Sequence, residues 1–481
     1  MNHLCLISLL SLLSASLSAQ DKVVTISATE KLQTVKGWGV SLCWWAKEAG
    51  VWPEEDMDQL VDWLVSPEHL NYNVFRYNIP GGDDPQHRNC KQEHMKGRKG
   101  LRAEMNGFKE YEDSPYNWEA DSAQIKIMKK IIARCHYYGK EAIVEAFANT
   151  PPYWMTVSGC CSGAADPNDT NLKPEYYGAF AQYLIDVCQH FKEEEVIEFY
   201  SLEPFNEAYT NYWYCGGQQE GCGFYPKDQV VFVKEHLAPL LKKSGLKTIL
   251  AVSDETSEKK SLDALESYLA DTESLDALQQ WNTHTYWYST KEGEKTRNEN
   301  RMELRDKIKG LGKALWMSET GQGGKGIDGN LNLSQTLFDD VRYLQPEVWC
   351  DWQYVDSGDQ WCLITCSGNA DKYFPPFKRN KNFFVRSQVS KYIKPGYSIL
   401  TTPQDNVLAA IDGKDSTLVV CILNKEDKAI SYKLEVEGAD NFKLHNATIT
   451  DPEHDNDGFD CPDITKITMP ARSIVTLEFQ R

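Results

Sequence analysis

Two glutamates that lie far apart in the chain each come near the end of a short apolar run. Glu207 closes the segment Ser-Leu-Glu-Pro-Phe-Asn-Glu, and Glu319 lies near the end of Leu-Trp-Met-Ser-Glu-Thr. Cleavage of a glycosidic bond needs such a pair, because one carboxyl group must protonate the leaving oxygen while an ionised carboxylate attacks or stabilises the oxocarbenium-like transition state. Glu207 and Glu319 are therefore the candidate catalytic residues.

Glu203 competes with Glu207 for the role of the acid, because it lies only four residues upstream. In an extended strand these two side chains point to the same side, so strand alternation does not choose between them. The position at the strand end and the adjacent Asn206 favour Glu207.

The two glutamates belong to a pattern in which short apolar runs alternate with longer amphipathic stretches, such as 120–138, 174–192 and 227–243. This alternation is typical of strand–helix units around a parallel sheet. Eight strands are predicted, at 37–44, 73–79, 141–149, 198–207, 247–255, 278–287, 314–320 and 348–355. Eight units indicate an α/β fold, the (β/α)8 TIM barrel, in which functional groups collect at the carboxyl ends of the strands. Both glutamates are expected there, on the fourth and seventh units.

A second domain is predicted after about residue 387, where short β-rich runs are separated by turn residues. This sequence pattern is typical of a β-sandwich, and the strand-like segment at 22–27 is expected to join that sandwich. We therefore expect four parts: a signal peptide at 1–19, an N-terminal strand segment at 20–36, the catalytic barrel at 37–386 and the β-sandwich at 387–481.

The first 19 residues resemble a cleaved secretory signal, because their apolar run is too short to span a bilayer. The protein is therefore expected to be secreted or periplasmic. Disulfides are expected in such a compartment, although their connectivity stays open. A zinc site is not expected, because paired C-x-x-C spacing is missing. The cysteines considered for loop-stapling disulfides are Cys160, Cys161, Cys215, Cys222, Cys350, Cys362 and Cys366.

Charge and aromatic content define the class of partner. A formal net charge of −19 argues against nucleic acid, since no basic stretch offsets the repulsion. The 14 Trp and 24 Tyr residues exceed the usual needs of a core, and sugar rings stack on such side chains. We expect a polysaccharide or oligosaccharide substrate, no cofactor or metal, no transmembrane segment after the signal peptide, and a monomer.

Several motifs resemble glycoside hydrolase family 30, a family of retaining barrel glycosidases in clan A. They are Asn206-Glu207, Ser318-Glu319 and the Lys-Pro-Gly run at 394–396. Within the family, the run at 37–46, which contains Trp44-Trp45, and Pro-Pro-Tyr-Trp-Met at 151–155 resemble most the endo-β-1,6-galactanase branch. The resemblance covers essentially the whole chain after the signal peptide.

The resemblance implies double displacement, with Glu207 as general acid/base and Glu319 as nucleophile, on β-1,6-galactosidic linkages of galactan or arabinogalactan side chains. A β-1,6-glucanase, or another β-glycosidase of the family such as a glucosylceramidase or xylanase, is the alternative. A carbohydrate-binding protein without catalysis is a different class, but it would not need both glutamates. A hydrolase of the Gly-x-Ser-x-Gly type is not supported, because that motif is missing.

The resemblance also implies roles around the two glutamates. Asn206 would donate to the sugar 2-hydroxyl, and Tyr286 would orient Glu319. Arg76 would hold Glu319 ionised and keep its pKa low. A carboxyl separation of about 5 to 5.5 Å is expected for a retaining pair. Further substrate-binding candidates are Trp352, as the floor for the reacting sugar, and Asn149, Trp44, Trp45, Tyr153 and Trp154. The insert at 81–117 is expected to form a wall of the cleft.

Overall fold

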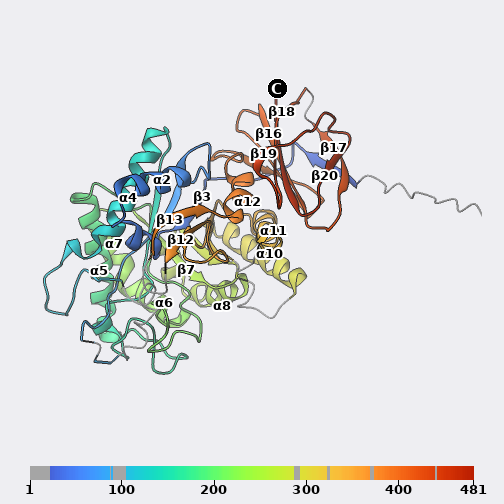
Figure 1. The fold of residues 1–481 in the computed structure, drawn as a ribbon. Helices are drawn as coiled ribbons and strands as arrows, with labels where there is room; N and C mark the ends of the chain where they lie inside the picture. Colours follow the sequence, from blue (N-terminus) through green and yellow to red (C-terminus); the bar gives the residue numbers. More distant parts are fainter. Residues whose placement is uncertain are drawn as a thin grey trace, which may run out of the picture.

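The computed structural model describes residues 22–86, 88–89, 105–286, 293–321, 326–368, 373–438 and 441–481. The expected signal peptide at 1–19 and part of the insert at 81–117 lie outside the described residues. The chain folds into a barrel followed by a sheet domain (Figure 1).

Eight parallel strands form a closed barrel, which confirms the predicted (β/α)8 architecture. The last strand pairs with the first, with Trp349 opposite Trp38, and this pairing closes the cylinder. Nearly every strand residue is buried, because the barrel interior covers one face of the sheet and the helices cover the other. The strands are β3 (Gly37–Ser41), β4 (Val74–Asn78), β5 (Ile143–Phe147), β6 (Ser201–Glu203), β7 (Ile249–Glu255), β8 (Gln280–His284), β9 (Ala314–Thr320) and β10 (Val348–Asp351).

Helices surround the barrel and begin where the local sequence provides a start signal. The Ser257 side chain caps one of them by accepting from the Lys260 N–H, and Asp271 caps the next in the same way. The α-helices are α1 (Trp45–Ala49), α2 (Glu54–Val65), α4 (Ser122–Tyr137), α5 (Tyr177–Glu193), α6 (Pro226–Phe232), α7 (Ala238–Ser244), α8 (Glu258–Leu269), α9 (Thr272–Ala277), α10 (Glu294–Gly310), α11 (Gly326–Asp339) and α12 (Lys381–Ser390). Short 3-10 helices are η2 (Trp118–Asp121), η3 (Tyr153–Met155) and η4 (Pro174–Tyr176), and π-helical turns are η5 (Val233–Leu237) and η7 (Asp340–Leu344).

The Gly-Trp-Gly sequence of β3 has a packing explanation. A Cβ atom on Gly39 would lie 2.3 Å from the Val74 carbonyl oxygen of the neighbouring strand, so a larger residue does not fit. Trp38, between the two glycines, donates from its indole nitrogen to the Ile393 carbonyl at 2.6 Å. This motif therefore sets the spacing of β3 and β4 and fastens the barrel to the chain that follows α12.

The C-terminal domain consists of two sheets that share one apolar core. The larger sheet has the order β19-β18-β21-β16-β15-β14-β2, and the smaller one has the order β1-β17-β20. Val24 and Leu434 from the smaller sheet pack with Ile422 and Leu477 from the larger. The strands are β1 (Lys22–Ser27), β2 (Lys31–Thr34), β14 (Ser398–Leu400), β15 (Val407–Ile411), β16 (Thr417–Asn424), β17 (Ile430–Glu437), β18 (Lys443–Thr450), β19 (Asp455–Gly458), β20 (Ile467–Met469) and β21 (Ser473–Gln480).

The N-terminal strand joins this sandwich, as the sequence predicted. β1 pairs in parallel with β17, and β2 pairs antiparallel with β14. In Figure 1 the blue N-terminal strand accordingly lies among the red strands near the C-terminus. The chain therefore starts in the sandwich, builds the barrel and returns to the sandwich.

Helix α12 connects the two domains. Arg386 Nε lies 3.0 Å from a carboxylate oxygen of Asp351 at the end of β10, and the Gln388 carbonyl accepts from the Thr476 hydroxyl of β21 at 2.7 Å. The predicted division between residues 386 and 387 falls inside this helix. A small sheet precedes it, made of β11 (Val355–Asp356), β12 (Ile364–Gly368) and β13 (Tyr373–Arg379).

The cysteines near the strand ends differ from expectation. Of the seven cysteines considered for disulfides, Cys160 is disulfide-bonded, whereas Cys222, Cys350, Cys362 and Cys366 carry free thiols in the described part of the chain. The expectation of loop-stapling disulfides is wrong for these four cysteines, because their thiols are buried in the packed interior. Within the described residues, none of the helices combines the length and the apolar character needed to cross a bilayer.

Candidate active site

The backbone around Glu207 differs from the predicted extended strand. β6 ends at Glu203, and Glu207 lies four residues further on with a left-handed φ of 50°. Its N–H donates to the Asp254 carbonyl at 2.8 Å, and its own carbonyl accepts from the Trp213 indole at 2.9 Å. These two contacts hold the strained residue in place and turn its side chain into the barrel mouth.

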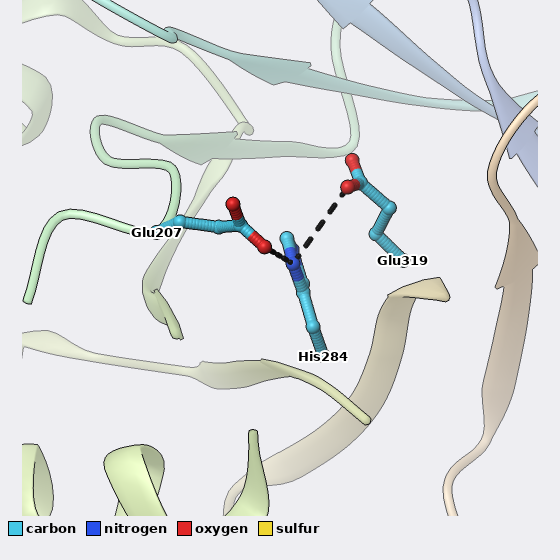
Figure 2. Close-up of side chains that lie close together, drawn as sticks. All are labelled: Glu207, His284 and Glu319. Carbon is cyan, nitrogen blue, oxygen red and sulfur yellow. Dashed lines mark hydrogen bonds and ion pairs between the residues drawn. The ribbon is translucent and has the colours of Figure 1, made fainter. Parts of the chain in front are cut away.

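The carboxyl groups of Glu207 and Glu319 approach each other over the end of the barrel, with His284 beside both of them (Figure 2). One oxygen from each glutamate and one nitrogen of His284 all lie within 4.8 Å of one another. Retaining glycosidases hold their two carboxyl groups about 5 to 5.5 Å apart, whereas inverting enzymes need roughly 6.5 to 9.5 Å to admit a water. The short separation between the Glu207 and Glu319 carboxyl groups suits direct attack of one carboxylate on the anomeric carbon of a sugar.

The structure brings two predicted partners to Glu319. Arg76 Nη1 lies 3.1 Å from one carboxylate oxygen, and the Tyr286 hydroxyl donates to the other at 3.0 Å. The prediction of a low pKa is nevertheless wrong. Burial raises the pKa of Glu319 to about 7, against the opposing effect of His284 and Arg76. Arg76 also binds Glu145 and Asp254, so its positive charge is shared among three carboxylates.

His284 is a site residue that the sequence reasoning missed. Its Nδ1 lies 3.0 Å from Glu207 and 3.7 Å from Glu319, and its Nε2 lies 3.1 Å from Asp254. Burial alone would lower the pKa of this imidazole, but Asp254, Glu319 and Glu207 raise it to about 10. His284 is therefore a cation at neutral pH. It precedes Tyr286 by two positions at the end of β8, so alternation along the strand could have identified it.

Asp254, near the end of β7, is the second missed residue. Its carboxylate accepts from Arg76 and from the Ser318 hydroxyl, and its carbonyl accepts from the Glu207 N–H. Burial would raise the pKa of Asp254, but Arg76 and His284 lower it to about 2. Asp254 is therefore an anion that joins the groups around Glu207 to those around Glu319.

Glu207, His284 and Glu319 are also the group among the described residues whose ligand atoms are close enough to hold a metal ion. A metal needs the neutral imidazole, because a protonated ring nitrogen has no lone pair to offer. The raised pKa of His284, and its contacts with carboxylates through both nitrogens, oppose that state. The donor set therefore suits hydrogen bonding to a pair of carboxylates better than metal binding.

A pocket of about 130 Å³ opens above the two glutamates, a size that suits one sugar ring. Five of the predicted substrate-binding residues line it, together with Gln219 and Trp361, which the sequence reasoning missed. Trp44 and Trp352 meet edge to face with their ring centres 5.2 Å apart, and form an aromatic wall. The five predicted residues are Trp44, Asn149, Asn206, Tyr286 and Trp352.

The other predicted substrate-binding residues do not line this pocket. Arg76 is fully buried below the pocket. Trp45 belongs to the core, where its indole donates to the Ser41 carbonyl at 2.8 Å. Tyr153 and Trp154 form part of η3 and are not among the residues that line this pocket.

Glu203, the competitor of Glu207, is fully buried below the site. Burial raises its pKa well above the ordinary value, and Asp254 and Glu145 add to that effect. The pocket is lined by Glu207 and not by Glu203. The geometry therefore favours Glu207 as the residue that meets a substrate.

Comparisons with known proteins show the family of this chain. Residues 21–289 match the model of O-glycosyl hydrolase family 30. An endo-β-1,6-galactanase from Hypocrea rufa is 29% identical over 438 residues, which cover 88% of this chain and 85% of that protein. An exo-β-1,6-galactobiohydrolase from Bifidobacterium longum subsp. longum is 24% identical over 416 residues, which cover 66% of this chain and 26% of that protein.

The fold has solved counterparts as well. A family 30 subfamily 8 xylanase from Clostridium acetobutylicum superposes with a TM-score of 0.68 at 18% identity, over 95% of this chain and 100% of that one. At this identity the likeness concerns the fold, whereas the family model covers more than half of the chain. The resemblance found in the sequence is confirmed: the chain belongs to O-glycosyl hydrolase family 30 and is a glycoside hydrolase.

Proposed function

We propose that this glycoside hydrolase is exported and cleaves β-1,6-galactosidic linkages in galactan or arabinogalactan side chains with retention of configuration. The observation that carries the proposal is the closely spaced pair of Glu207 and Glu319 at the base of a tryptophan-lined pocket. Two relatives named for β-1,6-galactan substrates support the choice of linkage and sugar. The signal-like residues 1–19 support export.

In the first step, the ionised carboxylate of Glu319 attacks the anomeric carbon while Glu207 protonates the departing glycosidic oxygen. The product is a galactosyl ester of Glu319. The Asn206 side chain lines the pocket next to Glu207 and is placed to donate to the sugar 2-hydroxyl, where a hydrogen bond strengthens as positive charge develops.

In the second step, Glu207 takes a proton from a water that attacks the ester from the opposite face, so two inversions restore the original configuration. His284 serves both steps, since its Nδ1 donates to Glu207 and lies near Glu319. The cation offsets negative charge on whichever carboxylate is ionised. Tyr286 orients the Glu319 carboxylate through its hydroxyl.

We expect the activity to fall as the pH decreases through about 7. Glu319 attacks only when it is ionised, and its raised pKa keeps it partly protonated below neutrality. In a His284→Gln variant this acid limb moves to higher pH, because the cation that favours the ionised form of Glu319 is gone. The measurement is kcat/KM for an aryl β-galactoside across the pH range, with His190→Gln as control. An acid limb near the ordinary glutamate value of about 4.3, or one that does not move in His284→Gln, would contradict this assignment.

The substrate is tested by product profiles on β-1,6-galactan, β-1,6-glucan and β-1,4-xylan in parallel, with Glu319→Gln protein as the inactive control. We expect galactose oligomers from the first polysaccharide alone. Cleavage of the glucan instead would keep the two glutamates but replace the sugar assignment. Cleavage of none of the three would favour a protein that binds carbohydrate without hydrolysing it. A ladder of oligomers indicates internal cleavage, and a single disaccharide indicates release from chain ends.

A further inference from the structure

The loop that follows Glu207 brings two further polar residues to the pocket. Gln219 lines it directly, and the next residue, Glu220, is a buried carboxylate that has no part in the two chemical steps. We propose that Gln219 is a specificity-determining residue that hydrogen-bonds hydroxyl groups of the bound sugar, and that Glu220 is a positioning residue that fixes the wall around it. This inference deepens the proposed function and rests on it for the identity of the sugar.

Glu220 joins three separate loops at the mouth of the barrel. One carboxylate oxygen accepts from Asn78 Nδ2 at the end of β4, and the other accepts from the Met105 N–H in the insert, both at 3.1 Å. The Trp44 indole, which follows β3, lies against the same carboxylate. Glu220 itself is only 1% exposed. A single side chain from the loop after β6 therefore binds the loops that follow two other strands.

These contacts reach the residues that line the pocket. Trp44 belongs to the pocket wall, and Asn78 accepts at its Oδ1 from the Asn149 N–H at 3.4 Å. Gln124 fixes Asn78 in turn, because its Nε2 donates to the Asn78 carbonyl at 3.1 Å. Glu220 is thus connected to three wall residues: Trp44 directly, Asn149 through Asn78, and Gln219 as its neighbour in the chain.

Burial of Glu220 needs an explanation, because placing a carboxylate in the interior is unfavourable. Burial raises the pKa of Glu220, while the hydrogen bonds from Met105 and Asn78 oppose that rise. A glutamine at this position would offer one acceptor oxygen in place of two. Glu220 binds the end of β4 through one oxygen and the insert through the other, which explains why a carboxylate is suited to this place.

The loop is also fastened close to the catalytic pair. Trp213 at its start donates to the Glu207 carbonyl, and its ring packs against Gly221, where an added Cβ would lie 2.2 Å away. The Gly221 N–H donates to the Cys161 carbonyl at 3.0 Å. Gln219 therefore extends from a backbone held on both sides, as a group that selects among substrates requires.

The chemistry of Gln219 suits a neutral sugar. A carboxamide donates through its nitrogen and accepts through its oxygen, so it matches the hydroxyl groups of a sugar ring, each of which does both. A site built to bind a hydroxyl disfavours analogues that lack it, because its polar group is then left without a partner. Gln219 is thus placed to distinguish sugars by the presence of particular hydroxyls.

The test couples a side-chain deletion to single hydroxyl deletions. Values of kcat/KM are measured for wild type and Gln219→Ala on an aryl β-galactoside and on analogues that each lack one hydroxyl. For a hydroxyl that Gln219 binds, we expect a penalty of about tenfold in wild type that falls to about twofold or less in the variant, while the other penalties stay unchanged. Gln218→Ala, at the exposed neighbouring position, should keep the wild-type pattern.

A second pair of variants tests Glu220. Glu220→Gln should reduce the same deletion penalty that Gln219→Ala reduces, because the wall that presents Gln219 loosens. Glu258→Gln is a control for loss of a buried carboxylate, since Glu258 is fully buried, binds Arg297 and does not line the pocket. Glu258→Gln should leave all hydroxyl-deletion penalties as in wild type, even if it lowers the melting temperature as much as Glu220→Gln does.

The inference is overturned if no hydroxyl penalty changes in Gln219→Ala, or if Glu220→Gln and Glu258→Gln give the same penalties. These outcomes differ from a failure of the proposed function. If wild type prefers an aryl glycoside of another sugar, the deletion series is made on that sugar, and the coupling to Gln219 is measured there.

Discussion

Replacing Glu319 with glutamine should lower kcat for galactoside hydrolysis by roughly 10⁴-fold or more, because the enzyme would lose the proposed nucleophile of the first step. The substitution preserves the size of the side chain and a hydrogen-bonding oxygen for Tyr286, whose hydroxyl donates to it at 3.0 Å. The measurement is the rate of hydrolysis of both an activated aryl β-galactoside and β-1,6-galactan. Both rates should fall together, since a good leaving group does not replace an attacking carboxylate.

Glu203→Gln is the matched control for this change. Glu203 is a fully buried glutamate outside the pocket, burial raises its pKa well above the ordinary value, and glutamine keeps the size of its side chain. A smaller variant, Glu319→Gly, leaves room for azide, which should attack from the face of the missing carboxylate and give an α-galactosyl azide. Substantial activity in Glu319→Gln, or an equal loss in Glu203→Gln, would contradict the role of Glu319.

Replacing Glu207 with alanine lowers the rate on galactan by roughly 10² to 10⁴-fold, because the departing sugar oxygen then leaves without a proton. A substrate with an acidic phenol as leaving group does not need that proton. With such a substrate, formation of the galactosyl ester should stay fast while its hydrolysis becomes slow. A rapid burst of phenol release followed by slow turnover is the expected time course.

Azide separates this role from that of the nucleophile. In Glu207→Ala it should attack the galactosyl ester from the side that Glu207 occupies, and therefore release a β-galactosyl azide. The two glutamates are thus distinguished by the anomeric configuration of the azide product. The assignment would be reversed if Glu207→Ala gave the α-azide and Glu319→Gly gave the β-azide.

Local sequence patterns were sufficient to predict the barrel, because short buried strands alternate with stretches of helical periodicity. The ends of the strands were predicted less accurately. The fourth strand was expected at 198–207, but it ends at Glu203, and Pro204 together with the left-handed φ of Glu207 marks a turn. The proposed catalytic acid therefore lies in a loop, whose shape depends on contacts with Asp254 and Trp213 that no local pattern contains.

Neighbouring residues of the same type show a second limit of prediction from the sequence. Trp44 and Trp45 are adjacent residues of the same type, and the sequence does not distinguish them. In the structure Trp44 lines the pocket, whereas Trp45 is the first residue of α1 and is directed into the core. Gln219 and Trp361 belong to loops after the fourth and eighth strands, where periodicity gives no information. Aromatic and polar loop residues are assigned only when the folded backbone shows which way they point.

The pKa of Glu319 shows the limit for electrostatics. Arg76 was correctly expected to contact this carboxylate, but the pKa of Glu319 was expected to be low and is raised instead. The outcome depends on the balance between burial and several charges contributed by distant segments, among them His284 and Asp254. A prediction based on the single ion pair of Arg76 and Glu319 therefore could not give the direction of the pKa shift.

The central claim is that Glu319 forms a covalent bond to the sugar. It is tested most directly by incubating the protein with an activated 2-deoxy-2-fluoro-β-galactoside, which slows both steps and traps the ester, and then mapping the modified peptide by mass spectrometry. The account predicts one fluorogalactosyl group per chain, attached to Glu319 and missing in Glu319→Gln. Attachment to Glu207 or another carboxylate, or hydrolysis of galactoside with inversion and no adduct, would contradict it.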